Sequence, residues 1–469
     1  MRVLTETRSG VFATLNEQSA LFFSLIRWTI LSSIVGVLAG FSTWAFVTGL
    51  NKSVQFTSDI PYLPFIIPLV IVLSAITGRY LAPESQGHGT EKIIEAVHKV
   101  SGRIRLRVVP VKTFTTILTI AGGGSAGKEG PAAQIGAALA SGFASILRLS
   151  DRDRKKIVVC GISAGFAAVF GTPVAGALFG IEVLFLGQIL YDVLVPSFIA
   201  GITAYQVSKW LGLSYWSHSI VDIPPFDQGF ILQLVLTGVV FGIVTVMFVE
   251  MIRFLARVLP KIWPNIVARS FMGGIALIGI TILFGREVMG LGTEHIERIV
   301  DGEQVSPFLW FGKMLATSIT LESGGSGGIV TPIFFVGAAF GSLWGQLIGM
   351  SPITTAALGT TSVLSGAANT PIAASMMAIE MFGPSIGPYA AGCAMVSFIM
   401  TGHRSIYPSQ VLAVSKNESL RGALKQPLTY ATASRLNQEG REELQKVYSL
   451  PITIFRFIVS GIWQRIKHD

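Results

Sequence analysis

Apolar runs of two lengths alternate along the chain. The runs at 21–50, 62–81, 193–213 and 230–254 are each long enough for a bilayer-spanning helix, which needs about 20 residues. The runs at 113–120, 131–147, 157–170 and 173–190 are mostly shorter and broken by glycine or proline, and a second short set occupies 270–402. Broken helices leave backbone groups unpaired, which a membrane protein tolerates only beside protein or a water-filled cavity. We therefore predict an all-α multi-pass membrane protein of about 16–18 helices, many broken or half-spanning, around a transport pathway.

The second half of the chain repeats the first. Three blocks recur in the same order about 200 residues later: 83–93 as 286–296, 123–131 as 324–332, and 172–182 as 370–380. Internal repeats with interrupted apolar segments are typical of secondary transporters and their channel relatives. We predict two inverted-topology repeats, about 21–213 and 229–407, in a transmembrane domain at 1–410. A cytoplasmic tail follows at 411–469, with one amphipathic stretch at 451–466.

Composition and charge agree with a membrane protein. Of the 469 residues, 51% are hydrophobic and only 13% are charged, about half the share in soluble domains. The net charge of +9 is concentrated at 99–112, 152–156, 253–269 and after 416, whereas 213–228 has no Lys or Arg. Because Lys and Arg mark cytoplasmic loops, we predict a cell (inner or plasma) membrane protein with both termini cytoplasmic and the 213–228 loop outside. The expected surroundings are a lipid bilayer, with no nucleic-acid partner.

The chemistry concentrates at helix starts, first at Gly127-Lys128-Glu129-Gly130-Pro131. Proline favours the first helical turn, and the free N–H groups of a helix start bind anions without a fixed cation. The Glu129 carboxylate can take the place of such an anion, so that its protonation or displacement opens the path. An ionisable group inside the membrane is a functional candidate, and we predict that Glu129 is the gating residue. The alternative is a carboxylate that caps the helix or pairs with Lys128.

Two further helix starts complete a predicted anion site. In the second repeat, Gly328-Ile329-Val330-Thr331-Pro332 has valine in place of the glutamate, so Ile329 and Val330 are expected to contribute backbone N–H groups. The segment Gly87-His88-Gly89 is the third start, and the His88 side chain can donate a hydrogen bond to an anion. The alternative for His88 is a polar cap at a cytoplasmic boundary. A site built from helix ends without a full positive charge binds an anion and still releases it quickly.

These residues resemble the CLC family of chloride channels and chloride/proton exchangers, over about 21–407. The motif positions that carry the resemblance are Gly87, Gly89, Gly127, Lys128, Glu129, Pro131, Gly328 and Pro332. The resemblance implies anion binding by His88, which replaces the family's serine, by Gly130, Ile329 and Val330, and by the hydroxyl of Tyr407. It also implies a homodimer with one pore per subunit, chloride as the bound ion, and a prokaryotic type without CBS domains.

Two positions depart from the pattern of that family. His88 stands where residue identity is associated with anion choice, so the preference between chloride and nitrate is left open. Val183 stands where the exchangers have an internal proton-transfer glutamate, and valine cannot relay a proton. We therefore predict transport of small inorganic anions, as a chloride channel gated by voltage or pH through Glu129. The alternatives are a chloride/proton antiporter, with protons as the second partner, and a sodium-coupled solute carrier.

Other classes of protein have weaker support. Residues 123–127 fit the G-x-S-x-G pattern of serine hydrolases, but the surrounding periodicity is helical and no Asp/His pairing is evident among the six histidines. An intramembrane serine protease is thus the rival from a different class. Cys160 and Cys393 lie in apolar stretches and imply no disulfide. We predict that the protein is not an enzyme, with no metal site and no cofactor apart from the chloride ion as bound substrate.

Overall fold

The chain folds into a bundle of α-helices in which two similar halves pack together. A computed structural model describes residues 2–220, 228–420 and 424–428, and sixteen α-helices lie within them. The first half contains α1 (Arg2–Ser58), α2 (Leu63–Leu81), α3 (Thr90–Lys99), α4 (Val108–Ala121), α5 (Glu129–Ile146), α6 (Asp151–Phe170), α7 (Pro173–Glu182) and α8 (Leu194–Trp210). The second half contains α9 (Gln228–Ile262), α10 (Ile266–Phe284), α11 (Thr293–Val300), α12 (Leu309–Glu322), α13 (Val330–Ile348), α14 (Pro352–Ala368), α15 (Pro371–Phe382) and α16 (Gly387–Met400).

Short elements connect these helices. Single 3₁₀ turns precede four of them: η1 (Pro83–Ser85), η2 (Tyr191–Val193), η3 (Arg286–Val288) and η4 (Pro384–Ile386). The strand β1 (Phe185–Leu186) pairs in parallel with β2 (Val411–Leu412). Each helix of the first half therefore has its counterpart, in the same order, in the second half. The all-α fold with two repeats that the sequence predicts is confirmed.

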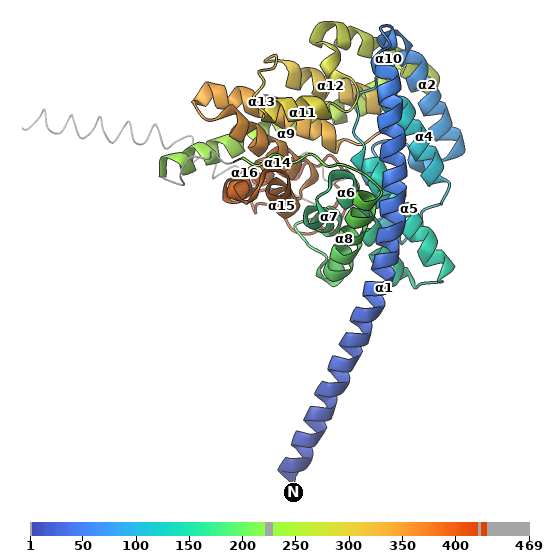
Figure 1. Cartoon of the computed structure of the whole chain (residues 1–469), viewed down its shortest axis with the longest axis vertical. Helices are drawn as coiled ribbons and strands as arrows, with labels where there is room; N and C mark the ends of the chain where they lie inside the picture. The colour runs from blue at the N-terminus through green and yellow to red at the C-terminus, as the bar shows by residue number, and fades with distance from the viewer. Residues whose placement is uncertain (1, 221–227, 421–423, 429–469) are drawn as a thin grey trace, which may run out of the picture.

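The packing of the two halves follows the repeat. In each half the first helix packs on the last, α1 on α8 and α9 on α16, and the helix after the glycine-rich motif packs on its successor, α5 on α6 and α13 on α14. Figure 1 shows α15 of the second half beside α7 of the first, with the start of α1 projecting away from the bundle. The helices α5 and α13 lie inside the bundle and are mostly buried.

Two glutamates join the halves reciprocally. The carboxylate of Glu182, at the end of α7, accepts the N–H groups of Ile372 (3.1 Å) and Ala373 (2.9 Å) at the start of α15. Its repeat partner Glu380, in α15, accepts the N–H groups of residues 174 (3.0 Å) and 175 (2.8 Å) at the start of α7. Each carboxylate satisfies helix-start donors that have no partner within their own helix. The structural role that the repeat indicates for this pair is confirmed.

Helix lengths agree with a membrane protein and correct several expected boundaries. Five helices within the described residues are long and apolar enough to cross a bilayer: 16–58, 63–81, 231–262, 266–284 and 330–348. The predicted helix at 173–190 ends at Glu182, because the next residues form β1. The predicted start at 157 is wrong by six residues, since α6 begins at Asp151, where the Ser150 hydroxyl accepts the N–H of Asp153.

The expected boundary between the transmembrane domain and the tail, at residue 410, falls within a segment that packs on the helices. The pairing of β2 with β1 ties residues 411–412 to the end of α7, and Leu186, Leu412 and Leu428 form a small buried apolar cluster. The part of the tail up to 428 that the structure describes therefore packs on the helical bundle. The amphipathic stretch at 451–466 lies outside the described residues, as does the 221–227 part of the loop expected outside the cell.

Candidate anion pathway

Three helix starts meet at one place in the bundle. The loops before α5 and α13 pair through Gly127 and Gly328, whose N–H groups each donate to the other's carbonyl at 2.7 and 2.5 Å. At the start of α5, Gly130 packs so closely on the His88 carbonyl that a Cβ at position 130 would overlap with it. Gly89, at the start of α3, has a left-handed φ of 78° and packs on the Gly130 carbonyl. These glycines bring the three backbones within contact of one another.

The Glu129 carboxylate lies on the start of the opposite helix, α13. Its Oε2 accepts the N–H of Thr331 at 3.1 Å, and its Oε1 accepts the Thr331 hydroxyl. The Glu129 side chain is completely buried. A carboxylate therefore occupies a helix start of the kind that binds anions. The N–H group that donates to this carboxylate is that of Thr331. It directly follows Ile329 and Val330, whose N–H groups were expected to bind the anion.

His88 and Tyr407 face each other beside these helix starts. Their ring centroids lie 5.8 Å apart, and both Nδ1 of His88 and the hydroxyl of Tyr407 are buried without a well-formed hydrogen bond among the described residues. The Tyr407 hydroxyl only approaches the side chain of Thr90. Buried polar atoms are normally hydrogen-bonded, so these two neighbouring atoms are candidates for binding a polar ligand.

A cavity of about 730 Å³ opens beyond Lys128 and Thr331. Residues 214–216 line it, so it faces the side of the molecule that carries the uncharged 213–220 loop, and 286–297 form another wall. Burial first, and then the charge of Glu294, raise the pKa of Glu297 in this wall, whereas the charge of Lys128 opposes the shift. Thr331, whose hydroxyl bonds to Glu129, is one of the residues that line this cavity.

Two completely buried lysines hold the loops before α3 and α11. The Lys112 ammonium donates to the carbonyls of Ser85 (3.0 Å) and Gly87 (2.5 Å). Its repeat partner Lys313 donates to the carbonyls of residues 288, 289 and 290 at 3.2, 3.3 and 2.9 Å, and lies 5.1 Å from the ring centre of Phe335. Neither ammonium has a carboxylate within ion-pair distance in the described part of the chain. Both cations are therefore uncompensated near the helix starts.

We expect Lys112→Met to weaken apparent anion affinity by on the order of tenfold, about 1.4 kcal/mol, because a buried charge acts in a weakly screened environment. Saturation of flux with anion concentration, in protein reconstituted into liposomes, measures this change. Lys209→Met is the control, since Lys209 is exposed at the end of α8. Equal saturation curves for the parent protein and the Lys112 variant would contradict an electrostatic role for Lys112.

We expect Tyr407→Phe to weaken anion binding by about 1 kcal/mol, roughly fivefold in affinity, because one hydrogen-bond donor is lost while the ring remains. Calorimetric titration of detergent-solubilised protein with chloride and with a second small inorganic anion checks this expectation. If Tyr407→Phe binds both ions with the affinity of the parent protein, the Tyr407 hydroxyl does not contact the bound anion.

The structure thus places the predicted residues in one region. Glu129, Gly130 and His88 lie beside Ile329 and Val330 through the Gly127–Gly328 pairing, and Tyr407 lies against His88. Sequence reasoning did not assign a role to Thr331, although its hydroxyl lies inside the second-half motif. It also assigned no role to Lys112 or to its repeat partner Lys313. The hydroxyl of Ser125, in the hydrolase-like pattern, hydrogen-bonds to the hydroxyl of Thr317 at 2.9 Å. A threonine hydroxyl is not a general base.

Two inverted repeats of broken helices, with helix starts converging beside a buried carboxylate, define a membrane protein that transports anions. Sequence and structure comparisons identify its family. The sequence profile of the voltage gated chloride channel family matches residues 69–402, and the chain belongs to this family, the CLC proteins.

Several related proteins are similar to this chain over most of its length and of their own. A chloride/fluoride channel protein of Pseudomonas syringae pv. tomato is 34% identical over 414 residues, which cover 86% of this chain and 90% of that protein. The H(+)/Cl(-) exchange transporter ClcA of Vibrio parahaemolyticus is 26% identical over 84% of this chain and 91% of its own. The crystal structure of a CLC-type fluoride/proton antiporter superposes with a TM-score of 0.80 at 30% identity, covering 83% of this chain and 98% of the other.

These relatives bear on the predicted function. Anion transport is confirmed by the membership of the family. The finer prediction of a chloride channel is not favoured over exchange, because the names of the relatives include both a channel and proton-coupled antiporters.

Proposed function

We propose that this protein exchanges a small halide, fluoride or chloride, for protons across the membrane. The observation that carries this proposal is the buried carboxylate of Glu129, bound to the N–H and hydroxyl of Thr331 at the start of α13. The similar fluoride/proton antiporter supports it. The proposal departs from the channel that Val183 alone favours in the sequence.

Competition for one helix start couples the anion to the proton. The start of α13 offers donors that an anion and the Glu129 carboxylate both accept, and two negative charges cannot share them. A protonated carboxyl is neutral and binds these donors more weakly, so it yields the place to the anion. Lys128, next to Glu129 in sequence, lines the cavity on the side of the 213–220 loop. In this proposal, water in that cavity supplies the proton to Glu129. Each anion that passes therefore requires a change in the protonation or position of Glu129.

The proposed anion site lies between the same helix starts and the pair His88–Tyr407. Its contributors are the backbone N–H groups at the starts of α5 and α13, from Gly130, Ile329 and Val330, together with the polar atoms of His88 and Tyr407. An O–H or N–H group forms a stronger hydrogen bond with fluoride than with a larger halide, because hydrogen-bond strength rises with the charge density of the acceptor. The relatives named for fluoride support this choice of ion. No resident cofactor or metal enters the proposal.

A channel for the same ions is the second candidate. Val183 favours it, since its side chain carries no titratable group at the inner end of α7. Its backbone carbonyl accepts the side-chain amide of Gln410 at 3.0 Å, which fixes this end of α7 to the segment after Tyr407. In a channel, Glu129 would open and close the path without a fixed ratio of protons to anions.

Liposomes that contain the purified protein distinguish the two candidates. A fluoride gradient, and separately a chloride gradient, is imposed while ion-selective electrodes follow the halide and a pH indicator follows protons. Exchange predicts uphill proton movement driven by the halide gradient, and a reversal potential displaced from that of the halide alone. Proton movement absent under both gradients would contradict exchange and leave the channel.

The assembly and topology also remain proposals. We propose a homodimer with one pathway per subunit, and both termini on the cytoplasmic side of the cell membrane, where the basic loops lie. Mass measurement in detergent tests the dimer, and a monomeric mass would contradict it. Reporter fusions at the C-terminus and within the 213–228 loop test the topology: they are expected to report opposite sides.

A further inference from the structure

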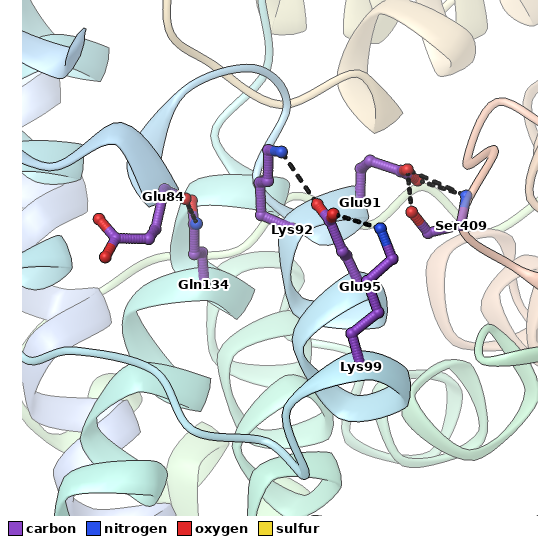
Figure 2. Close-up of polar contacts among 7 residues, drawn as sticks. All are labelled: Glu84, Glu91, Lys92, Glu95, Lys99, Gln134 and Ser409. Atoms are coloured by element: carbon purple, nitrogen blue, oxygen red, sulfur yellow. Dashed lines mark hydrogen bonds and ion pairs between the residues drawn. The ribbon is translucent and has the colours of Figure 1, made fainter.

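A second carboxylate, the half-buried Glu91, lies at the start of α3, two residues after Gly89, which packs on Gly130. It belongs to the first turn of α3, directly after Thr90, and it accepts the backbone N–H of Ser409 at 2.9 Å and its hydroxyl at 2.5 Å. Figure 2 shows the Glu91 side chain turned toward Ser409, away from Lys92, Glu95 and Lys99 of the same helix. Glu91 therefore makes its contacts with the segment that carries Tyr407.

This segment connects Glu91 to the candidate site. Ser409 follows Tyr407 by two residues, and Tyr407 packs on His88. The next residue, Gln410, donates to the carbonyls of Val183 and Ala368, both at 3.0 Å. Glu91 thus lies where the inner end of α7, the start of α3 and the segment after α16 meet.

The other acidic groups around this point have different partners. Glu84 pairs with Arg107 at 2.9 Å, and Glu95 pairs with Lys92 and Lys99, both at 2.9 Å. Hydrogen bonds from Lys99 and then Lys92 hold the pKa of Glu95 below its usual range, so this group stays ionised. Glu182 accepts two N–H groups of α15. Glu91 instead bonds to a hydroxyl and an N–H of one residue, although Lys92 is its neighbour in sequence.

The hydrogen-bond partners of Glu91 are of the same kind as those of Glu129. Each carboxylate is held by the N–H and the hydroxyl of one residue, Ser409 for Glu91 and Thr331 for Glu129. A hydroxyl donates to a carboxylate, and after rotation it accepts from a protonated carboxyl. Both protonation states of the acid therefore keep a partner, which is what a group that gains and loses a proton inside a protein requires.

We infer that Glu91 takes up and releases the coupled proton on the inner side of the anion site. The inference rests on the proposed exchange function. In the step, a carboxylate oxygen of Glu91 accepts a proton from water on the side of the basic loops, forming an O–H bond. That proton later leaves Glu91 and passes His88 and Tyr407 to the carboxylate of Glu129, and Glu91 returns to the carboxylate. The charged or titratable groups that face Glu91 are Lys92 and Glu95 on α3, and Tyr407 on the segment after α16.

The test measures halide and proton movement separately in liposomes that contain the full chain. Glu91→Gln keeps the shape and an acceptor for Ser409, but it cannot carry a proton. We expect its proton movement to fall at least about tenfold, with halide flux near that of the parent. Glu95→Gln, one turn further along α3, is the matched control and should retain both fluxes. Glu91→Asp keeps the titratable group and should move protons more slowly than the parent but faster than Glu91→Gln.

The outcomes separate this inference from the proposed function. A parent protein that moves no protons overturns both. A coupled parent with an equally coupled Glu91→Gln variant overturns the role of Glu91 alone. Parallel loss of halide and proton flux in a folded Glu91→Gln variant also overturns it, because that pattern marks a residue that only positions Tyr407. Where Glu91→Gln does not fold, Ser409→Ala decides: slower proton movement at unchanged halide flux supports the inference, and equal loss of both fluxes overturns it.

Discussion

Replacement of Glu129 by glutamine is expected to abolish proton movement while halide flux continues. The neutral amide can bond to Thr331 but brings no charge to the start of α13, so an arriving anion displaces it without a proton. The halide flux of the parent is expected to rise as the pH falls, because protonation removes the competing carboxylate. The flux of Glu129→Gln is expected to be independent of pH. Paired halide and proton recordings in liposomes, from neutral to acidic pH, measure both properties.

An acid that lines the cavity beside Lys128 and Thr331 provides the control for Glu129→Gln. Glu294 lines the cavity and is exposed, and Glu294→Gln is expected to retain coupling and pH dependence. A folded Glu129→Gln protein that transports no halide would contradict the gating role. Retention of full proton coupling by that variant would contradict the carrier role.

Replacement of Gly130 by alanine is expected to reduce halide flux by at least about tenfold, because the new Cβ overlaps with the His88 carbonyl. Interiors are close-packed, so α3 or α5 must shift by enough to separate the helix starts. The added methyl group is expected to lower the unfolding free energy by about 1–3 kcal/mol. Flux in liposomes and thermal unfolding in detergent measure the two effects.

The same substitution at Gly279 is the control. Gly279 lies in α10 with no neighbouring atom where its Cβ would be placed, so Gly279→Ala is expected to retain flux and stability. Parent-like flux in Gly130→Ala would show that the close approach of α3 and α5 does not shape the pathway.

Much of the candidate site was predictable because local sequence determines helix starts. Glycines followed by a proline fix where α5 and α13 begin, to within one or two residues, and the repeat indicates that these starts are equivalent. Glu129 was identifiable as a charge in an apolar stretch, where an ionisable group is costly. The partner of Glu129 was not predictable, since Thr331 lies 202 residues further along the chain.

The sequence by itself determined that this is a membrane protein of two repeats, with helix starts of the kind that bind anions and a carboxylate at one of them. These properties follow from hydropathy, spacing and residue type, which are local. Only the tertiary structure decided which equivalent residues differ in their surroundings. Glu91 and Glu294 occupy equivalent places in the repeat, yet Glu294 is exposed beside the cavity whereas Glu91 bonds to Ser409. The physical reason is that the segment after α16 packs over only one of the two helix starts, and no local pattern encodes that contact.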